Sequence, residues 1–266
     1  MEKVAYLGPD GSYSSLAARK LCPDGKCVPY ASFRLAMNAV LSGECTSAAL
    51  PIENSLNGAV LANIDLLQSA EGVVATRETK LALDHRLAVL KGADIRGISR
   101  IYSHEQPLAQ CSEYLFSTFP NARLISTPST AASIEMIKSP SDAAIVGAHV
   151  KVDGIELTPR NIADSTNNYT VFLLVERGEV DEKKRSEKIY FSVTCRHASG
   201  ALLDILEPMR AGGLNMTKIQ SRPIKNYAGE YRFFIEVEGD YSSPSVRAVL
   251  GGVREISSSF KILGAY

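Results

Sequence analysis

Two hydrophobic patterns alternate along residues 1–175. Short apolar runs of strand length, at 4–7, 48–52, 99–103, 122–126 and 143–147, are separated by segments in which apolar residues recur at helical spacing. Ser32 precedes one such segment as a typical N-cap, and Val60, Ile64 and Leu67 mark another. This alternation predicts an α/β fold with parallel sheet and crossover helices.

Two longer stretches, 73–90 and 169–176, have an extended pattern without an intervening helix. A strand of that length runs beyond the edge of one small sheet. We therefore expect the two stretches to cross between two lobes of the first domain.

The charge-dense segment 176–187 offers almost nothing to bury and is the predicted linker. We expect domains at 1–178 and 186–266. Ser242 or Ser243, followed by Pro244, is a typical helix start in the second domain. The elements predicted there are strand 188–196, helix 201–211, strand 214–223, strand 231–238, helix 245–256 and strand 260–263. This βαββαβ order is ferredoxin-like.

Composition narrows the classes of partner. Lys plus Arg and Asp plus Glu balance at 29 each, so no net field favours nucleic acid or an anionic membrane. No apolar stretch approaches the roughly 20 residues of a membrane span, and a strand-like run follows Met1 where a secretion signal would lie. The five cysteines are scattered, and Cys22 and Cys27 lack a second pair that would complete a zinc site. We expect free thiols and a cytoplasmic location.

Four predicted junctions before helices carry polar residues. The loop 7–15 is rich in Gly and Ser, a composition that suits an anion cradle at a helix start and equally suits an ordinary turn and cap. Glu53, Asn54 and Ser55 follow a predicted parallel strand, where open α/β sheets place ligands, although turns use the same residue types.

The other two junctions lie near residues 103 and 129. Ser103 and Gln106 have capping-box spacing, which leaves His104 either as a general base or in an ordinary hydrogen-bonding role. Ser129 and Thr130 begin a fourth helix. Together the junctions predict a cleft lined with hydroxyl and amide groups.

The same segments resemble the prephenate dehydratase family, in the family's order and over nearly the whole chain. The Pro-Ile-Glu-Asn-Ser-x-x-Gly motif is matched in full at 51–58, and Asn-x-Thr-Arg-Phe is matched at 168–172 except for Val171. Further similar segments are 8–14, 102–104, 108–111, 200–203 and 214–223, the last two resembling the phenylalanine-binding motifs of an ACT domain.

The resemblance implies a two-lobed catalytic domain like a periplasmic binding protein, with the active site between the lobes. It implies conversion of prephenate to phenylpyruvate, water and carbon dioxide, without cofactor or metal. Thr170 is the implied hydrogen-bond or proton donor to the departing hydroxyl, acting through preorganised hydrogen bonding. The implied substrate-binding residues are Ser12, Tyr13, Ser14, Glu53, Asn54, Ser55, Gly58, Ser129, Thr130 and Phe172.

For the second domain the resemblance implies an ACT domain that binds phenylalanine as allosteric effector, in a homodimer or homotetramer. The implied effector-binding residues are Gly200, Ala201, Leu202, Leu203, Asn215, Met216, Gln220, Ser221 and Arg222. Gln220 stands where the family usually carries Glu, so we expect weakened sensing.

Val171 replaces the family's Arg and removes a charge. If that Arg binds substrate, its loss costs roughly 1.5–3 kcal/mol, and Lys80, Arg86, Arg160 and Arg177 are candidates to compensate. If it only braces the strand, the effect is small. The departure leaves open arogenate dehydratase, a prephenate decarboxylase that does not aromatise, or a catalytically impaired regulator that binds phenylalanine or prephenate.

Overall fold

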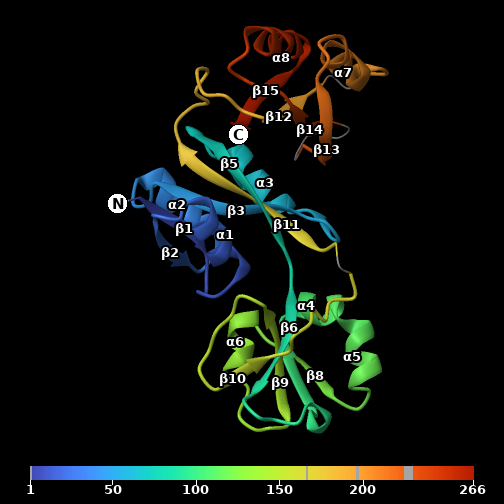
Figure 1. Ribbon diagram of the computed structural model, residues 1–266. Helices are drawn as coiled ribbons and strands as arrows, with labels where there is room; N and C mark the ends of the chain where they lie inside the picture. The colour runs from blue at the N-terminus through green and yellow to red at the C-terminus, as the bar shows by residue number, and fades with distance from the viewer. Residues whose placement is uncertain (1, 166, 196–197, 225–229) are drawn as a thin grey trace.

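The computed structural model describes residues 2–165, 167–195, 198–224 and 230–266, without the side chains of residues 130 and 131. Over these residues the chain is a mixed α/β protein with one ten-stranded and one five-stranded sheet. Figure 1 shows the smaller sheet as a separate lobe below the larger one. The predicted α/β class is thus confirmed, with sheets that are mixed rather than purely parallel.

The first lobe is built around a sheet whose parallel part is β2, β1 and β3, followed by β11 and β5. Strand β11 is antiparallel to both of its neighbours, because the chain returns along it from the second lobe. The elements are β1 (Lys3–Leu7), α1 (Tyr13–Leu21), β2 (Lys26–Tyr30), α2 (Phe33–Ser42), β3 (Ser47–Asn54), β4 (Gly58–Ala59), α3 (Leu61–Ser69), β5 (Val73–Ala82) and β11 (Tyr169–Arg177).

The second lobe holds the five-stranded sheet, in the order β10, β6, β9, β7, β8. Its buried strand Asp142–Gly147 lies at the centre and pairs with β6 and β7. The elements are β6 (His85–Leu90), η1 (Ile95–Gly97), β7 (Arg100–Ser103), α4 (Glu105–Gln110), α5 (Ser112–Thr118), β8 (Arg123–Ser126), α6 (Thr130–Ile134), β9 (Asp142–Gly147) and β10 (Ile155–Leu157).

The extended stretch predicted at 73–90 is β5 followed by β6, with a break at Leu83 and Asp84, and it crosses from the larger sheet to the smaller one. The prediction that 169–176 also crosses is wrong, because β11 lies wholly in the larger sheet between β3 and β5, and the return crossing is the segment between β10 and β11. The backbone N–H of Leu83 donates to the carbonyl of Asn168, so the two crossings are hydrogen-bonded where they leave the first lobe. Functional side chains near this point are therefore fixed to both lobes.

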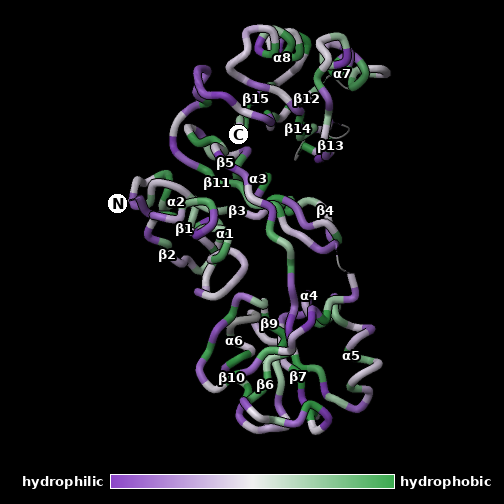
Figure 2. The backbone as a smooth tube through the Cα atoms, viewed as in Figure 1, coloured by the Kyte–Doolittle hydropathy of each residue, from purple (hydrophilic) through white to green (hydrophobic). Residues whose placement is uncertain are grey.

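The C-terminal unit follows the hydrophilic segment that Figure 2 shows between β11 and β12. Its elements are β12 (Lys188–Thr194), α7 (Ala201–Ala211), β13 (Asn215–Pro223), β14 (Tyr231–Glu238), α8 (Pro244–Ile256) and β15 (Ser259–Ala265). This is the predicted βαββαβ order. Ser243 is the N-cap residue of α8 and Pro244 begins the helix, as expected.

The sheet of the C-terminal unit is continuous with that of the first lobe. Strand β15 runs parallel to β5, with Gly264 opposite Ala75. A Cβ atom at Gly264 would lie 2.5 Å from the carbonyl oxygen of Ala75, so only glycine permits this approach. The hydrophobic core also spans the junction, since Val171 shares a cluster with Tyr190 and Phe234. The two predicted units are joined by backbone and core.

Most predicted helix starts are confirmed, but one cap is corrected. Ser32 accepts the N–H of Leu35, and Ser129 caps α6. Ser103, by contrast, is buried in β7 and donates to the carbonyl of Ile145, while His104 is the N-cap of α4. The predicted capping box is therefore wrong, because Ser103 is drawn into the sheet. Strands β2, β4 and β10 were not predicted.

Candidate active site

A cavity of about 610 Å³ lies where the first loop, the end of β3, the two crossings and the second lobe meet. Residues from all four predicted polar junctions line it. The polar residues that line it are Ser12, Tyr13, Ser14, Asn54, His85, His104, Gln106, Gln110, Ser129 and Thr170. Phe172 also lines it, because residues two apart in a strand point to the same face and Phe172 is two residues beyond Thr170. The predicted cleft of hydroxyl and amide groups is thus present at one place.

Asn54 and Thr170 are directly opposite each other on β3 and β11. The Nδ2 atom of Asn54 donates to the Thr170 hydroxyl oxygen at 3.1 Å and contacts the side-chain oxygen of Asn168 at 3.2 Å. Among the residues that the structure describes, no protein group accepts a hydrogen bond from the Thr170 hydroxyl. Its O–H is therefore free to donate to a ligand in the cavity.

The orientation of Asn54 is fixed by the turn that follows it. Its Oδ1 atom accepts the backbone N–H groups of Leu56 and Asn57 at 3.1 and 3.0 Å. The amide oxygen is thus used by the backbone, which directs the NH₂ group towards Thr170. Thr170 and Asn54 are both buried at the cavity wall, where the low local dielectric strengthens the hydrogen bond between them.

The first loop contributes three of the predicted residues. Ser12 caps α1 by accepting the N–H of Ser15 at 3.2 Å, and Ser14 faces the cavity from the first turn. The Tyr13 hydroxyl donates to the carbonyl of Asp84 at 2.9 Å, which ties the loop to the crossing between lobes. Burial raises the pKa of Tyr13, so it remains a neutral donor.

Sequence reasoning missed His85 and Gln110. The Nε2 atom of His85 lies 2.9 Å from Oε1 of Gln110, and both residues line the cavity. Burial lowers the pKa of His85, although the Gln110 hydrogen bond and nearby Asp84 act in the other direction. The available signal for Gln110 was its place in the segment 108–111 that resembles the family, whereas His85 had only its place in the extended stretch 73–90.

Three polar atoms around this cavity are buried and lack a protein partner within the described residues: His85 Nδ1, Gln110 Nε2 and Asn168 Nδ2. Unpaired buried donors and acceptors are unfavourable unless a ligand or water satisfies them. His85 and Gln110 line the cavity, and Asn168 contacts Asn54, which donates to Thr170.

No Lys or Arg is among the described residues that line the cavity. The four candidates to replace the family's Arg are also outside it. Lys80 lies over the Tyr169 ring, with Nζ 3.3 Å from the centroid, and Arg86 pairs with Asp84. Arg160 and Arg177 line other parts of the surface. An anionic ligand would therefore be held by neutral hydrogen-bond donors.

Val171 lies on the face of β11 opposite Thr170. Its side chain is buried in the cluster shared with the C-terminal unit and does not line the cavity. Across the neighbouring strands it faces Glu53 and Lys80. A side chain that keeps this direction points away from a ligand beside Thr170.

Several predicted residues lie outside the cavity. Glu53 pairs with Lys218 of β13 on the opposite face of β3. Ser55 donates to the carbonyl of Asn167 and accepts the N–H of Tyr169, so it ties together the two strand ends. Gly58 occupies the turn before α3 with φ of 75°. The predicted side chain of Thr130 lies outside the described residues.

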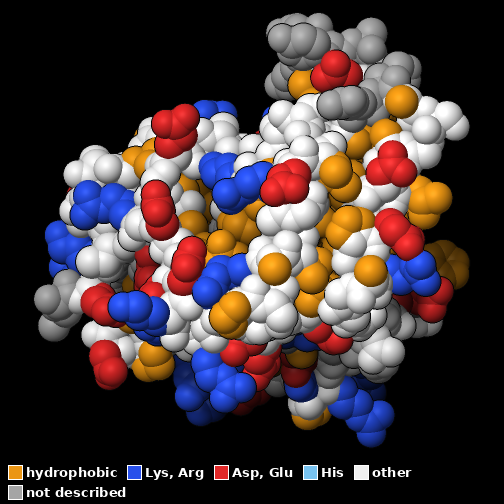
Figure 3. Space-filling model, turned by 90° about the horizontal axis from the view of Figure 1, so that it is seen from above, with side chains coloured by type: hydrophobic (Ala, Val, Ile, Leu, Met, Phe, Trp, Pro, Cys, Tyr) orange, Lys and Arg blue, Asp and Glu red, His pale blue; other side chains and the backbone are white. Residues whose placement is uncertain are grey.

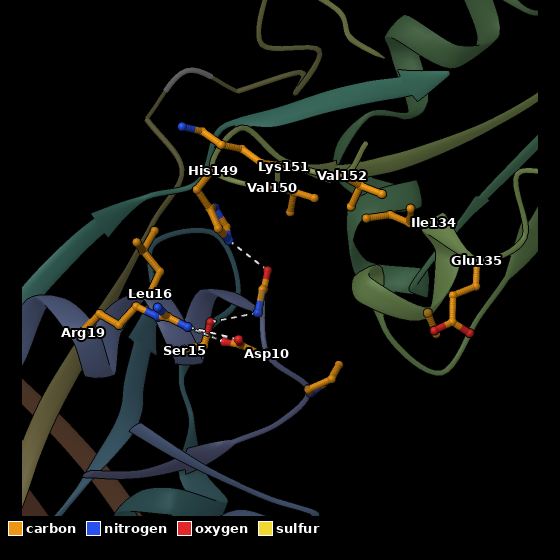
Figure 4. Close-up of a pocket in the computed structure, with 13 residues that line it drawn as sticks. Asp10, Ser15, Leu16, Arg19, Ile134, Glu135, His149, Val150, Lys151 and Val152 are labelled. Carbon is orange, nitrogen blue, oxygen red and sulfur yellow. Dashed lines mark hydrogen bonds and ion pairs between the residues drawn. The ribbon is translucent and has the colours of Figure 1, made fainter. Parts of the chain in front are cut away.

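A larger groove of about 910 Å³ adjoins this cavity at Pro9. Figure 4 shows His149 of the second lobe pointing at the first loop, where its Nε2 lies 2.9 Å from the Gly11 carbonyl oxygen. Asp10 and Arg19 at the rim pair with each other at 2.8 Å and are exposed. Glu135 and Lys151 also line this groove, but none of the predicted substrate-binding residues is among its described lining, so the cavity at Thr170 is the candidate site.

Other classes of site find no support in the described part of the chain. It contains no group of three or more His, Cys, Asp or Glu that could hold a metal ion, and the five cysteines are free thiols. Within the same residues no helix is long and apolar enough to cross a membrane. On the face shown in Figure 3, acidic and basic side chains are interspersed rather than gathered by sign.

Comparison with known proteins agrees with this geometry. The sequence model of the prephenate dehydratase family matches residues 4–180. The prephenate dehydratase of Amycolatopsis methanolica is 31% identical over 271 residues, covering 100% of this chain and 88% of that relative.

Among solved structures, the prephenate dehydratase of Arthrobacter aurescens in complex with L-Phe superposes with a TM-score of 0.88 at 29% identity, covering 99% of this chain and 90% of that one. GqqA, described as a novel type of quorum quenching acylase, superposes equally well, with a TM-score of 0.88 at 26% identity over 100% of this chain and 97% of that one. With the family match, the sequence identity along the whole chain and Thr170 held by Asn54 in a shared cavity, this chain belongs to the prephenate dehydratase family.

Proposed function

We propose that the chain converts prephenate to phenylpyruvate, carbon dioxide and water in phenylalanine biosynthesis. The observation that carries this proposal is the Asn54–Thr170 pair, which leaves a hydroxyl donor aimed into a polar cavity. Family membership supplies the substrate class. Everything the reaction needs from the protein is binding, orientation and a donor to the departing hydroxyl.

In this reaction the bond between the ring and its carboxylate breaks, and its electron pair enters the ring as the hydroxyl leaves. The hydroxyl takes up one proton and becomes water, while the carboxylate becomes carbon dioxide. Thr170 is too weak an acid to supply that proton alone, so its O–H stabilises the developing charge by a hydrogen bond and the proton comes from solvent. Asn54 holds Thr170 in place for this role.

The two carboxylates of prephenate find partners among the polar groups that line the cavity. The Gln106 amide and the hydroxyls of Ser14 and Ser129 supply donors there. The pyruvyl side chain and the ring carboxylate would thus be bound by neutral donors, with Phe172 and Pro107 supplying apolar contacts to the ring.

Burial of Val171 away from the cavity supports prephenate dehydratase over the alternatives that rest on the missing Arg. These alternatives differ in what an assay would detect. Arogenate dehydratase and a non-aromatising decarboxylase would give other substrate preferences or products, and an impaired regulator would give no product. The structural similarity to GqqA adds acylase activity as a fourth outcome to be measured.

One assay separates these functions. Purified protein is incubated with prephenate at neutral pH, and phenylpyruvate is followed by its enolate absorbance in base while mass spectrometry detects other products. We expect phenylpyruvate in amounts equal to prephenate consumed. Arogenate as substrate, and an amide substrate for acylase activity, are run in parallel. Absence of phenylpyruvate would contradict the proposal.

We further propose that the C-terminal unit is an ACT domain that binds phenylalanine, and that the two lobes form a catalytic domain like a periplasmic binding protein. The predicted effector residues fall in two groups. Strand pairing puts Asn215 at one end of β13, level with Lys188, and Arg222 at the other end, level with Thr194, after which the chain leads to Gly200. Gly200 is the N-cap of α7 and Asn215 follows the other end of that helix, so the 11 residues of α7 separate the two positions by roughly 16 Å.

A single phenylalanine is too small to reach both. The predicted contacts of its carboxylate with the N–H groups after Gly200 and of its ammonium with Asn215 thus require two subunits. Strand β13 is at the edge of the sheet, where a second copy has access. This supports a homo-oligomer in which effector binding and assembly are linked.

Isothermal titration with phenylalanine, and with tyrosine as control, tests this site. Gly200→Val is expected to abolish binding, but Gly200 has φ of 85°, so valine also strains the backbone. Asn215→Leu is therefore the second variant, since Asn215 makes only a side-chain bond to Glu238. Equal binding of both amino acids, or binding unchanged in Asn215→Leu, would rule out the site.

The free thiols support a reducing compartment, the cytoplasm, as the place of action.

A further inference from the structure

The last two residues of β3 point to opposite faces of the sheet. Asn54 faces the cavity and donates to Thr170, whereas Glu53 faces the C-terminal unit. Strand geometry requires this, because consecutive side chains alternate between faces. A displacement of the Glu53 side chain therefore acts on the backbone next to Asn54, the residue that donates to Thr170.

Lys218 of β13 is the residue that holds Glu53. Its Nζ pairs with Oε2 of Glu53, and both side chains are largely shielded, with 17% and 27% of their surface exposed. The Lys218 ammonium also lies 5.9 Å from the centroid of the buried Tyr190 ring. An ion pair of limited exposure is held more firmly than one on the open surface.

Strand β13 is also the strand predicted to bind the effector. Lys218, Gln220 and Arg222 lie on one face, towards the first lobe, and Arg222 pairs there with Asp65 of α3. The strand thus has effector residues at both ends and, between them, a cation fixed to the end of β3.

Two carboxylates, those of Glu53 and Glu236, lie near the Lys218 ammonium. The nearby Glu236 is buried and already accepts hydrogen bonds from Thr217 and Tyr266. Burial raises the pKa of Glu236, but these hydrogen bonds and the Lys218 ammonium outweigh it and lower the pKa overall. Two fixed carboxylates therefore keep the Lys218 ammonium at the junction of the two units.

We propose that Lys218 is a positioning residue of the active site, which through Glu53 fixes Asn54 against Thr170 and carries the effector signal from β13 to the reaction. This inference rests on the proposed function. Movement of β13 on effector binding would displace Glu53, and Asn54 would follow because it is the next residue of the same strand. Lys218 itself touches no substrate.

The test is a double-mutant cycle with Lys218→Met, Glu53→Gln and the double variant, assayed on the full chain with prephenate, with and without phenylalanine. Each single variant is expected to lower kcat about two- to thirtyfold with little change in KM, and the double variant to be no worse than either. The inhibition by saturating phenylalanine should fall in all three, while phenylalanine affinity by titration stays within about twofold. Lys218→Arg, which keeps the charge, should restore most of kcat.

Lys261→Met is the matched control. Lys261 of β15 donates to the carbonyl oxygens of Gln68 and Ala70 at 2.8 and 2.6 Å across the same junction, and these contacts do not involve Glu53 or Glu236. This variant should keep the wild-type kcat and inhibition. A kcat and an inhibition in Lys218→Met equal to those of the wild type would overturn the inference, as would a raised KM in Glu53→Gln alone, which would make Glu53 a substrate ligand.

Assays of the wild-type chain distinguish failure of the proposed function from failure of the inference on Lys218. If it forms no phenylpyruvate or binds no phenylalanine, the proposed function fails and the inference falls with it. If the wild type is active and inhibited while the cycle shows additive effects of Lys218→Met and Glu53→Gln, the proposed function stands and the inference alone is overturned.

Discussion

In the proposed mechanism Thr170 donates a hydrogen bond to the departing hydroxyl, and Asn54 holds the Thr170 oxygen in place for this role. Thr170→Ala is expected to lower kcat about a hundredfold or more while KM changes little, since the bond to the departing hydroxyl strengthens in the transition state. Steady-state kinetics measures both. Thr170→Ser, which keeps the hydroxyl, is the control, and a comparable kcat in the alanine variant would remove Thr170 from the mechanism.

Val171 is expected to be silent in catalysis. Its side chain is buried behind the cavity, so Val171→Arg should not raise kcat/KM. A longer, charged side chain overfills this core and competes with Lys218 for Glu53, and we expect a loss of about 1–3 kcal/mol in the free energy of unfolding. Kinetics and urea denaturation test both parts. A clear gain in kcat/KM would show that the cavity lacks a cationic partner.

His85 is expected to make the free energy of unfolding depend on pH. Because burial lowers its pKa below the usual 6.5, the unfolded chain binds more protons than the folded chain between these two values. Stability contributed by neutral His85 is therefore present above about pH 6.5 and is lost as the pH falls towards the lowered pKa.

The measurement compares the free energy of unfolding near neutral pH and at about pH 5. The wild type should lose more stability on acidification than His85→Gln, which keeps an amide in place of the imidazole and cannot titrate. An identical pH dependence in the two proteins would mean that His85 is not the group responsible.

At the scale of elements, the contact between β15 and β5 decides how the C-terminal unit is attached. Gly264→Ala would place a methyl group 2.5 Å from the Ala75 carbonyl oxygen, which is closer than a carbon atom can lie. The two strands must separate, and we expect a loss of about 1–3 kcal/mol in stability. Thermal unfolding measures it, with Gly251→Ala on an open face of α8 as control. An unchanged melting temperature for Gly264→Ala would contradict the shared sheet.

Elements also show where pattern reading succeeds. Helix α7 was predicted with its observed bounds, Ala201–Ala211, because apolar spacing and flanking glycines mark both ends. Strand β2 (Lys26–Tyr30) was missed, since its residues are only partly buried and Pro29 interrupts the pattern. The short helices α4 and α5 follow one another at Cys111, which is both the C-cap of the first and the N-cap of the second.

At the scale of the whole molecule, the separation of Gly200 from Asn215 within one chain predicts assembly. Light scattering at working concentration should give a dimer or a tetramer of dimers, and phenylalanine should shift any equilibrium towards it. Exposed apolar side chains on the edge strand β13, Met216 and Ile219, favour burial by a second copy. A monomer that still binds phenylalanine selectively would contradict the two-subunit site.

The sequence by itself predicted most of the helices and strands, because these depend on local periodicity, and its contiguous motifs pointed to Asn54 and Thr170 as candidate site residues. It did not determine that Glu53 and Val171 face away from the cavity. A two-residue period shows that neighbours lie on opposite faces but not which face meets the ligand. Only the tertiary structure brought His85 to Gln110, Lys218 to Glu53 and Gly264 to Ala75, because these contacts join segments far apart in the chain.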